Sequence, residues 1–285
     1  MLTAVIGLLG AFVYGSADFL GGLAARRISP LRVTAVSAFT GLAALLVAFV
    51  FVGGRWSVAA VGWGALSGVT GAIGISLLYA CLAIGPMSIL SPLTALVSAV
   101  VPMTWGLLGG EALPPIGYAA LGLALVAVAL VGFVPEKGAV RPRLLGILMA
   151  VGSGAMLGAF FILIDQTPHD SGLVPLLLNR SVTGVLMLAA VGVLAAVARR
   201  GGMREGGWRQ GLALAMACGL VDAAANVLLL VGLRIGDLSV ISVLTAMYPA
   251  GTIALAALVL RERIAPVQWA GLMLALVAAG MLAVA

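Results

Sequence analysis

Charged side chains are scarce in this sequence, where Asp, Glu, Lys and Arg together make up only 8% of 285 residues. Soluble domains carry roughly 25% charged residues, so a soluble fold of this composition could not cover its own surface. Because 63% of the residues are hydrophobic, the expected solvent is a lipid bilayer. The apolar runs are too long and too continuous for barrel strands, so the sequence predicts an all-α integral membrane protein.

Cysteine and histidine are also rare. Cys81 and Cys218 both lie inside apolar runs, which favours buried thiols over a disulfide or a metal site. The single histidine, His169, stands beside Asp170 and is expected to be solvated. The sequence has no nucleophile–base pair and no phosphate-binding glycine loop followed by lysine, which argues against an enzyme and against an ATP-driven pump. We therefore expect no catalytic residue, no metal and no cofactor.

The net charge of +6 does not indicate a nucleic-acid partner, because the arginines fall in short loops between apolar runs, as topology signals do. The first residues lack the basic segment and the cleavage site of a signal peptide, so they are expected to form a retained helix.

Apolar residues fall into ten runs, each about as long as a membrane-spanning helix. Five runs precede the loop at 135–142 and five follow it, which predicts two repeats, at residues 1–136 and 137–285. The expected spans cover residues 3–23, 32–52, 59–82, 86–109, 115–134, 143–164, 173–197, 211–233, 237–260 and 265–284.

An internal repeat supports this division. The stretch Ile84–Pro115 aligns without a gap on Ile235–Pro266, and a glycine, two serines, a threonine, a glutamate and a proline all recur in register. Because each half holds an odd number of spans, the second half must enter the membrane from the opposite side. The sequence therefore predicts ten transmembrane helices in two inverted five-helix repeats, an architecture that places the substrate site of many secondary transporters near the midplane.

Basic residues are concentrated in alternate loops. Loops after even-numbered runs contain only Arg55 and Arg234. Loops after runs one, five, seven and nine hold Arg26, Arg27, Arg32, Lys137, Arg141, Arg143, Arg199, Arg200, Arg204, Arg209, Arg261 and Arg263. Since basic loops stay in the cytoplasm, both termini are expected to be external.

Ionisable residues inside a span require an explanation, because each costs about 2.5–3.5 kcal/mol at the centre of the helix. Asp18 lies in the first run, Arg180 in the seventh and Asp222 near the middle of the eighth. Each could belong to a substrate or proton site, or to a structural ion pair. For Arg180 we expect the structural role, as the partner of Asp165 at the same membrane face.

A polar face is expected on the eighth span, because Asn226 lies one helical turn beyond Asp222. Tyr79 and Tyr248 add aromatic surface that could face a cavity or belong to the core. We interpret these residues, together with Asp18, as candidate substrate contacts.

Hydroxyl groups and prolines mark the fourth and ninth spans. Ser91 and its repeat counterpart Ser242 could contact a ligand or bond a carbonyl of the preceding turn. Pro92, Pro102 and Pro249 each remove a backbone donor and permit a bend. They are candidate hinges, and replacing Pro102 or Pro249 by alanine is expected to stiffen the span. Small residues elsewhere, such as Gly64, Gly68 and Gly71, are expected to serve helix packing.

Three short motifs resemble those of a known family. Tyr14-Gly15-Ser16 resembles the Trp-Gly-Ser signature of EamA-type carriers, Asn179-Arg180 resembles their intramembrane arginine, and Glu111 and Glu262 resemble the Gly-Glu ends of their fourth and ninth spans. The chain thus resembles the ten-span EamA branch of the drug/metabolite transporter superfamily, which includes YddG-type amino-acid exporters. Two features differ from that family: Ser37 stands where the first half would carry its arginine, and the loop charge reverses the usual orientation.

The resemblance implies a secondary transporter, probable direction export, for small polar metabolites such as amino acids, working by alternating access as a monomer in a bacterial-type inner membrane. Tyr14 would then contact the substrate, and protons could be the coupling ion. Other metabolites or amphipathic drugs are alternative substrates. A membrane assembly protein that transports nothing is an alternative of another class.

Overall fold

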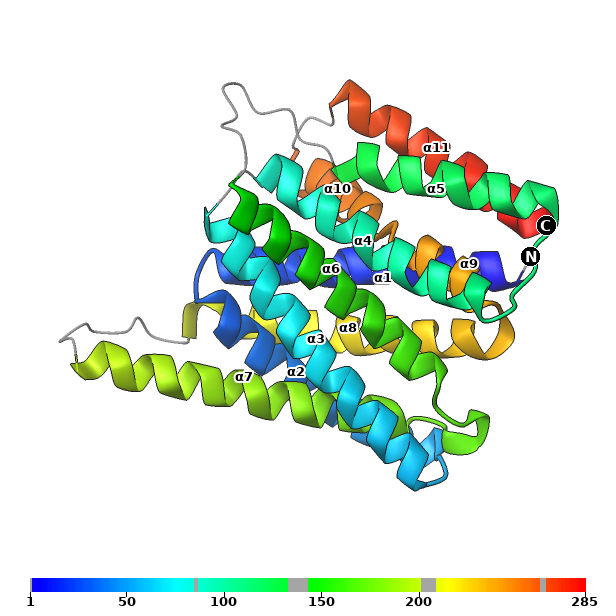
Figure 1. The fold of residues 1–285 in the computed structure, drawn as a ribbon. Coiled ribbons are helices and arrows are strands. Elements are labelled where there is room, and N and C mark those ends of the chain that lie inside the picture. Colours follow the sequence, from blue (N-terminus) through cyan, green and yellow to red (C-terminus); the bar gives the residue numbers. More distant parts are fainter. Residues whose placement is uncertain (1, 85–86, 133–142, 201–208, 262–264) are drawn as a thin grey trace.

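The fold is that of a computed structural model, which describes residues 2–84, 87–132, 143–200, 209–261 and 265–285 (Figure 1). Within these ranges, the side chains of residues 79, 82–84, 87–88, 91–92, 198–200 and 210 lie outside the description.

The described residues form helices and contain no strand. The first half comprises α1 (Leu2–Ala25), α2 (Pro30–Val52), α3 (Val58–Ile84), α4 (Met87–Leu108) and α5 (Pro115–Gly132). The second half comprises α6 (Leu144–Asp165), the short 3-10 helix η1 (His169–Ser171), α7 (Val174–Arg200), α8 (Arg209–Ile235), α9 (Leu238–Thr245), α10 (Tyr248–Val259) and α11 (Pro266–Val284).

Eight stretches of the described chain are long and apolar enough to cross a membrane, and two shorter apolar helices, Leu93–Leu108 and Pro115–Val131, accompany them. The prediction of an all-α membrane protein is confirmed. The count of ten spans stays a prediction, although a helix occupies each of the ten expected positions.

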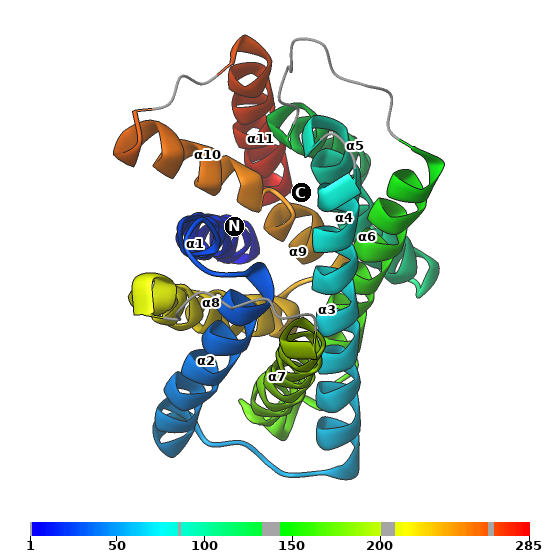
Figure 2. The ribbon, with the colours of Figure 1, turned by 90° about the vertical axis from the view of Figure 1, so that its left-hand side faces the viewer.

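Most helices pack on partners from the other half of the chain. Helix α1 packs on α8 and α10, α2 packs on α7 and α8, and α5 packs on α11. Helix α3 lies against α6 and α7, and α4 lies against α6 and α9. Figure 2 shows α1 enclosed between α8 and α10, apart from α3 and α4. The two halves are therefore interleaved and do not form separate bundles.

Glycines allow several of these close approaches, as the sequence predicted for Gly64 and Gly68. A Cβ atom on Gly68 would lie 2.7 Å from the Asn179 carbonyl oxygen, and one on Gly64 would lie 2.7 Å from the Pro175 Cα atom. Both glycines therefore pack α3 directly on α7. Gly71, one turn further along, has open space in place of a Cβ atom.

The ninth expected span occupies its expected place, since Leu238–Val259 is long and apolar enough to cross a membrane, and it is interrupted within its length. Helix α9 ends at Thr245 and α10 begins at Tyr248, with a tightened turn in which Met247 N–H donates to the Leu244 carbonyl at 3.1 Å. Pro249 lies in the first turn of α10, where a missing N–H group leaves no helical bond unmade. Pro102, by contrast, lies inside the unbroken α4.

Candidate functional site

A cavity of about 220 Å³ lies where the two halves meet. Liquid water takes about 30 Å³ per molecule, so the space corresponds to roughly seven waters and suits a small metabolite. Its walls come from both halves and combine aromatic with polar side chains. The lining residues are Tyr14, Asp18, Gly71, Ile75, Leu78, Ser98, Leu157, Phe160, Phe161, Asn179, Arg180, Thr183, Asp222, Asn226, Thr245 and Tyr248.

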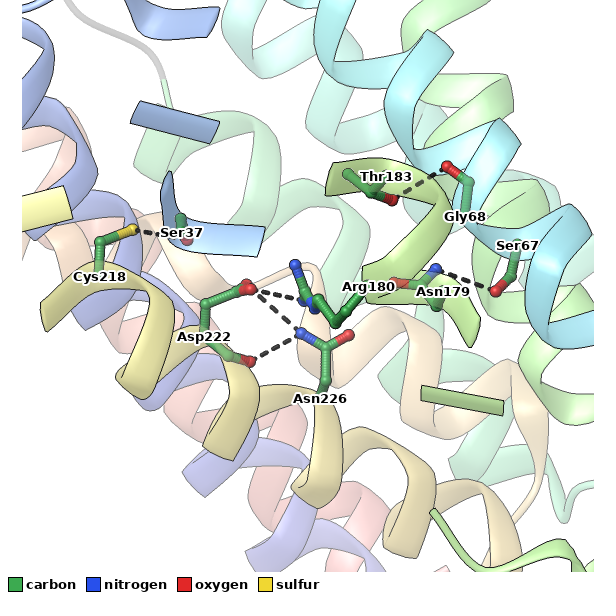
Figure 3. Close-up of polar contacts among 9 residues, drawn as sticks. All are labelled: Ser37, Ser67, Gly68, Asn179, Arg180, Thr183, Cys218, Asp222 and Asn226. Atoms are coloured by element: carbon green, nitrogen blue, oxygen red, sulfur yellow. Dashed lines mark hydrogen bonds and ion pairs between the residues drawn. The ribbon is translucent and has the colours of Figure 1, made fainter. Parts of the chain in front are cut away.

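An ion pair crosses this cavity from α7 to α8. Arg180 Nη2 lies 2.5 Å from Asp222 Oδ2, and both side chains are largely buried (Figure 3). The angles do not meet those of a hydrogen bond, so charge and proximity define the contact. The expected pairing of Arg180 with Asp165 was therefore wrong. Arg180 lies six residues into α7, about 9 Å along its axis, whereas Asp165 ends α6 and lies near Arg234.

Asn226 fixes the position of Asp222 from one turn further along α8. Its Nδ2 atom donates to the Asp222 backbone carbonyl at 2.7 Å and lies 3.4 Å from Asp222 Oδ1 (Figure 3). The bond to the carbonyl uses the amide nitrogen and leaves Asn226 Oδ1 without a hydrogen-bond partner. The amide thus orients the carboxylate and still presents a free acceptor.

Two more contacts set the rotation of the helices that carry the pair. Asn179 Nδ2 donates to Ser67 Oγ at 2.9 Å, and Thr183 Oγ1 donates to the Gly68 carbonyl at 3.1 Å (Figure 3). These bonds attach α7 to α3 on both sides of Arg180 along the chain. On the other flank, the Ser37 hydroxyl lies 3.6 Å from the sulfur of Cys218, four residues before Asp222.

Several polar atoms around the cavity have no partner. Tyr14 Oη, Arg180 Nε and Asn226 Oδ1 are buried and make no hydrogen bond within the described chain. Asp18 is accessible where it lines the cavity, and no hydrogen bond or ion pair to a described residue satisfies its carboxylate. Buried polar groups are normally hydrogen-bonded, so this cluster indicates a place for a polar ligand or for water.

The Glu111 side chain caps the start of α9 from the other half of the chain. Glu111 Oε1 accepts a hydrogen bond from Leu238 N at 2.8 Å, and Oε2 accepts one from Ser239 N at 3.0 Å. The residue preceding α9, Asp237, makes no such cap of its own. Burial raises the pKa of the Asp237 carboxyl, and the Glu111 carboxylate adds to that rise.

Hydrogen bonds attach the end of α8 to the segment that follows α6, at the same end of the molecule as the start of α9. Arg234 Nη1 donates to the Thr167 carbonyl at 2.7 Å, and Nη2 donates to the Pro168 carbonyl at 3.1 Å. All eight residues of α9 are buried beside these contacts. Both termini lie at this end of the bundle (Figure 1).

Comparison with known proteins identifies the second half of the chain. Residues 144–284 match the family model described as "EamA-like transporter family". This part of the chain is similar to that family. That family consists of transporters and not of enzymes.

The matched segment includes most of the cavity wall, from Leu157 to Tyr248. No curated protein matches the chain. A solved structure titled only "Crystal structure of protein" is similar, with a TM-score of 0.76 at 16% identity, and the match covers 99% of this chain and 98% of that one. At this identity the similarity shows the fold alone, and it extends over both halves.

The second half supplies three of the expected substrate contacts to the cavity, Asp222, Asn226 and Tyr248, and the first half supplies Tyr14 and Asp18. Ser242 is absent from the lining, and its hydroxyl donates to the Ser239 carbonyl at 3.2 Å. The expected residues Tyr79, Ser91 and Pro92 lie in helices, but their side chains are outside the described part.

Sequence reasoning missed the contribution of α7. Asn179, Arg180 and Thr183 all line the cavity. An arginine next to an asparagine inside an apolar run was the available signal. It was assigned to a pair with Asp165 because the sequence does not show how deep Asp222 lies relative to Arg180.

Proposed function

We propose that this protein is a secondary transporter of small polar metabolites, with amino acids as the expected substrates, and that it works by alternating access. The observation that carries the proposal is the cavity between the two halves, which has an ion pair, an uncompensated carboxylate and unpartnered polar atoms. A cavity at such an interface, lined by a few polar groups on an apolar wall, is typical of small-molecule sites.

The packing pattern supports an inverted repeat. When the halves are exchanged, the pair α1–α8 becomes α6–α3, and the pair α2–α8 becomes α7–α3. All four pairs are in contact. Helices α2 and α7, which would exchange with each other, also pack together, as do α5 and α11. A two-fold relation between halves gives a carrier two equivalent ends that can open in turn.

The interrupted helix supports movement at the cavity. Thr245 ends α9, Tyr248 begins α10, and both line the cavity on either side of the break. Broken helices in carriers commonly form the substrate site. A change in the angle between α9 and α10 would alter the cavity and its access path together. The contacts of Glu111 and Arg234 hold the end that carries the termini closed in this conformation.

Transport by the purified protein in liposomes tests the proposal. Exchange of labelled amino acids across the bilayer is the expected result, and Asp222→Asn or Arg180→Met is expected to reduce it. If a pH gradient drives net flux, Asp18 and Asp222 are the carboxylates through which protons would couple. Failure of amino acids, other small metabolites and amphipathic drugs alike to exchange would contradict a carrier.

A non-transporting assembly protein predicts a different interior. Such a bundle should be dry at its centre. Single cysteines at positions 222 and 248, in a variant without Cys81 and Cys218, should react with a small water-soluble thiol reagent if the cavity is part of a transport path. Unreactive thiols at both positions would favour the assembly role.

A further inference from the structure

The charges around the cavity do not balance. Within the described lining, three side chains carry formal charge: Asp18, Asp222 and Arg180. Arg180 is engaged by Asp222 at 2.5 Å. Asp18, on α1, has no cation beside it among the described residues, and it shares the cavity with the second carboxylate. The cavity as a whole therefore has an excess of one negative charge when all three groups are ionised.

We propose that the cavity recognises its substrate by a positively charged amino group, and that Asp18 is the residue that selects for it. This inference rests on the proposed transport function and names the chemical class of its substrate. A cation beside Asp18 would restore neutrality in a cavity where the Arg180 and Asp222 side chains are largely buried, and charge pairs interact more strongly there than in bulk water. An anion entering alone would meet two carboxylates and an arginine that is already paired.

The unpartnered atoms extend the assignment beyond charge. An ammonium group has three donors and no acceptor. Asp18 and the free Asn226 Oδ1 supply acceptors for it. The remaining unpartnered groups, Tyr14 Oη and Arg180 Nε, can donate to a carboxylate. A compound with an amino group and a neighbouring carboxylate thus uses the two acceptors and the two donors. An amine without the carboxylate still uses the two acceptors, Asp18 and Asn226 Oδ1.

Aromatic faces favour the same class. Tyr14, Phe160, Phe161 and Tyr248 all line the cavity. Aromatic faces attract ammonium groups and repel carboxylates, since the ring quadrupole is negative at its face. The preference for a cation therefore has two sources, and removal of Asp18 should weaken it strongly without abolishing the contribution of the rings.

Binding to the purified protein in detergent tests the inference separately from transport. The probes are three compounds with the same isobutyl side chain. Leucine carries an amino group and a carboxylate, 3-methylbutylamine carries only the amino group, and 4-methylpentanoate carries only the carboxylate. Calorimetric titration of the wild type should show binding of leucine and of the amine, and at least about 10-fold weaker binding of the acid. A charge-assisted hydrogen bond has a strength that corresponds to a change of this size.

Variants at position 18 identify the selecting residue. Asp18→Asn should weaken binding of the amine about 10-fold or more while leaving the acid unchanged or improved. Asp18→Glu keeps the charge and should retain the preference for the amine, which guards against loss by misfolding. Asp170→Asn is the matched control, because this exposed carboxylate pairs with Arg55 away from the cavity. This substitution should leave the binding of all three probes unchanged.

The proposal is overturned if the wild type binds the acid as tightly as the amine, if it binds no amine at millimolar concentration, or if folded Asp18→Asn keeps the full preference. Selective binding without exchange in liposomes would leave the assignment of Asp18 standing and contradict the transport function instead. Exchange in liposomes without amine selectivity would support the transport function and contradict the assignment of Asp18.

Discussion

The Arg180–Asp222 pair shows how much one residue depends on another in a largely buried site. Their side chains are 12% and 19% exposed, so loss of either partner leaves a charge with little access to water. Breaking a buried pair costs about 3–5 kcal/mol, whereas replacing both members with apolar residues is often neutral. The pair therefore links α7 to α8 across the cavity, and we expect it to contribute little net stability.

This asymmetry gives a prediction for stability. Arg180→Met should lower the thermal unfolding temperature in detergent clearly, because Asp222 then loses its counter-ion. The double variant Arg180→Met with Asp222→Leu should recover most of that loss. The control is Arg55→Met, which removes an exposed pair with Asp170 and should have almost no effect. A double variant less stable than the single one would mean that the pair is a net stabilising contact.

At the scale of elements, the start of α9 depends on a residue from the other half of the chain. The Glu111 carboxylate accepts two backbone hydrogen bonds at the positive end of the α9 dipole. Removing a cap of this kind costs about 1–2 kcal/mol. That is small against total stability but large enough to change the balance between two conformations.

We therefore predict that Glu111→Ala opens this end of the molecule. A single cysteine at Ser239, which is fully buried, should become more reactive toward a membrane-impermeant thiol reagent when Glu111 is replaced. Tyr118→Phe is the control, since it removes only the long hydrogen bond from Leu113 N to Tyr118 Oη, near Glu111 in the connection between α4 and α5. Equal labelling rates with and without Glu111 would show that the cap does not hold the end closed.

The helix break changes what is expected of the prolines. Replacing Pro249 by alanine restores no helical hydrogen bond, because the residue lies in the first turn of α10. Pro102 lies within α4 and is packed against Gly158. In liposomes at saturating substrate, Pro249→Ala should therefore turn over at close to the wild-type rate, while Pro102→Ala should be slower. Equal slowing in both variants would restore the hinge role that the sequence suggested for Pro249.

Sequence alone predicted the positions of the helices, because hydropathy and span length depend on local composition. It did not predict the partner of Arg180 or the choice of Thr245 over Ser242 in the cavity wall. These depend on helix depth and rotation, which packing between distant segments determines. The interruption of the ninth span was expected at Pro249 and lies just before it, between Thr245 and Tyr248. Hydropathy could not locate it, because the stretch Leu238–Val259 remains apolar across the break.

At the scale of the whole molecule, the ends of the bundle differ in charge. Both termini lie at one end, and the end of α1, the start of α2 and the end of α10 lie at the other (Figure 1). Arg26 and Arg27 follow α1, and Arg261 follows α10. The positive-inside tendency thus predicts that the termini lie outside.

A topology reporter tests this orientation. A reporter that is active only outside the cytoplasm should show activity when it is fused after Ala285. A reporter that is active only in the cytoplasm should show none at the same position. The same two reporters after Arg27, in a truncated chain, provide the opposite control. Cytoplasmic activity at Ala285 would show that the loop charges do not decide the topology.

The packing of α1 also means that its partners are synthesised long after α1 itself. Helix α1 is made first, yet it packs mainly on α8 and α10, and α8 is complete only at Ile235. At a synthesis rate of about 5–20 residues per second, α1 waits roughly 10–40 s in the membrane before α8 is available. During that time Asp18 has neither its cavity nor the other half of the protein around it. The nascent chain must therefore tolerate a carboxylate within a solitary helix, and a ribosome that stalls before α8 leaves behind a fragment that membrane quality control can recognise.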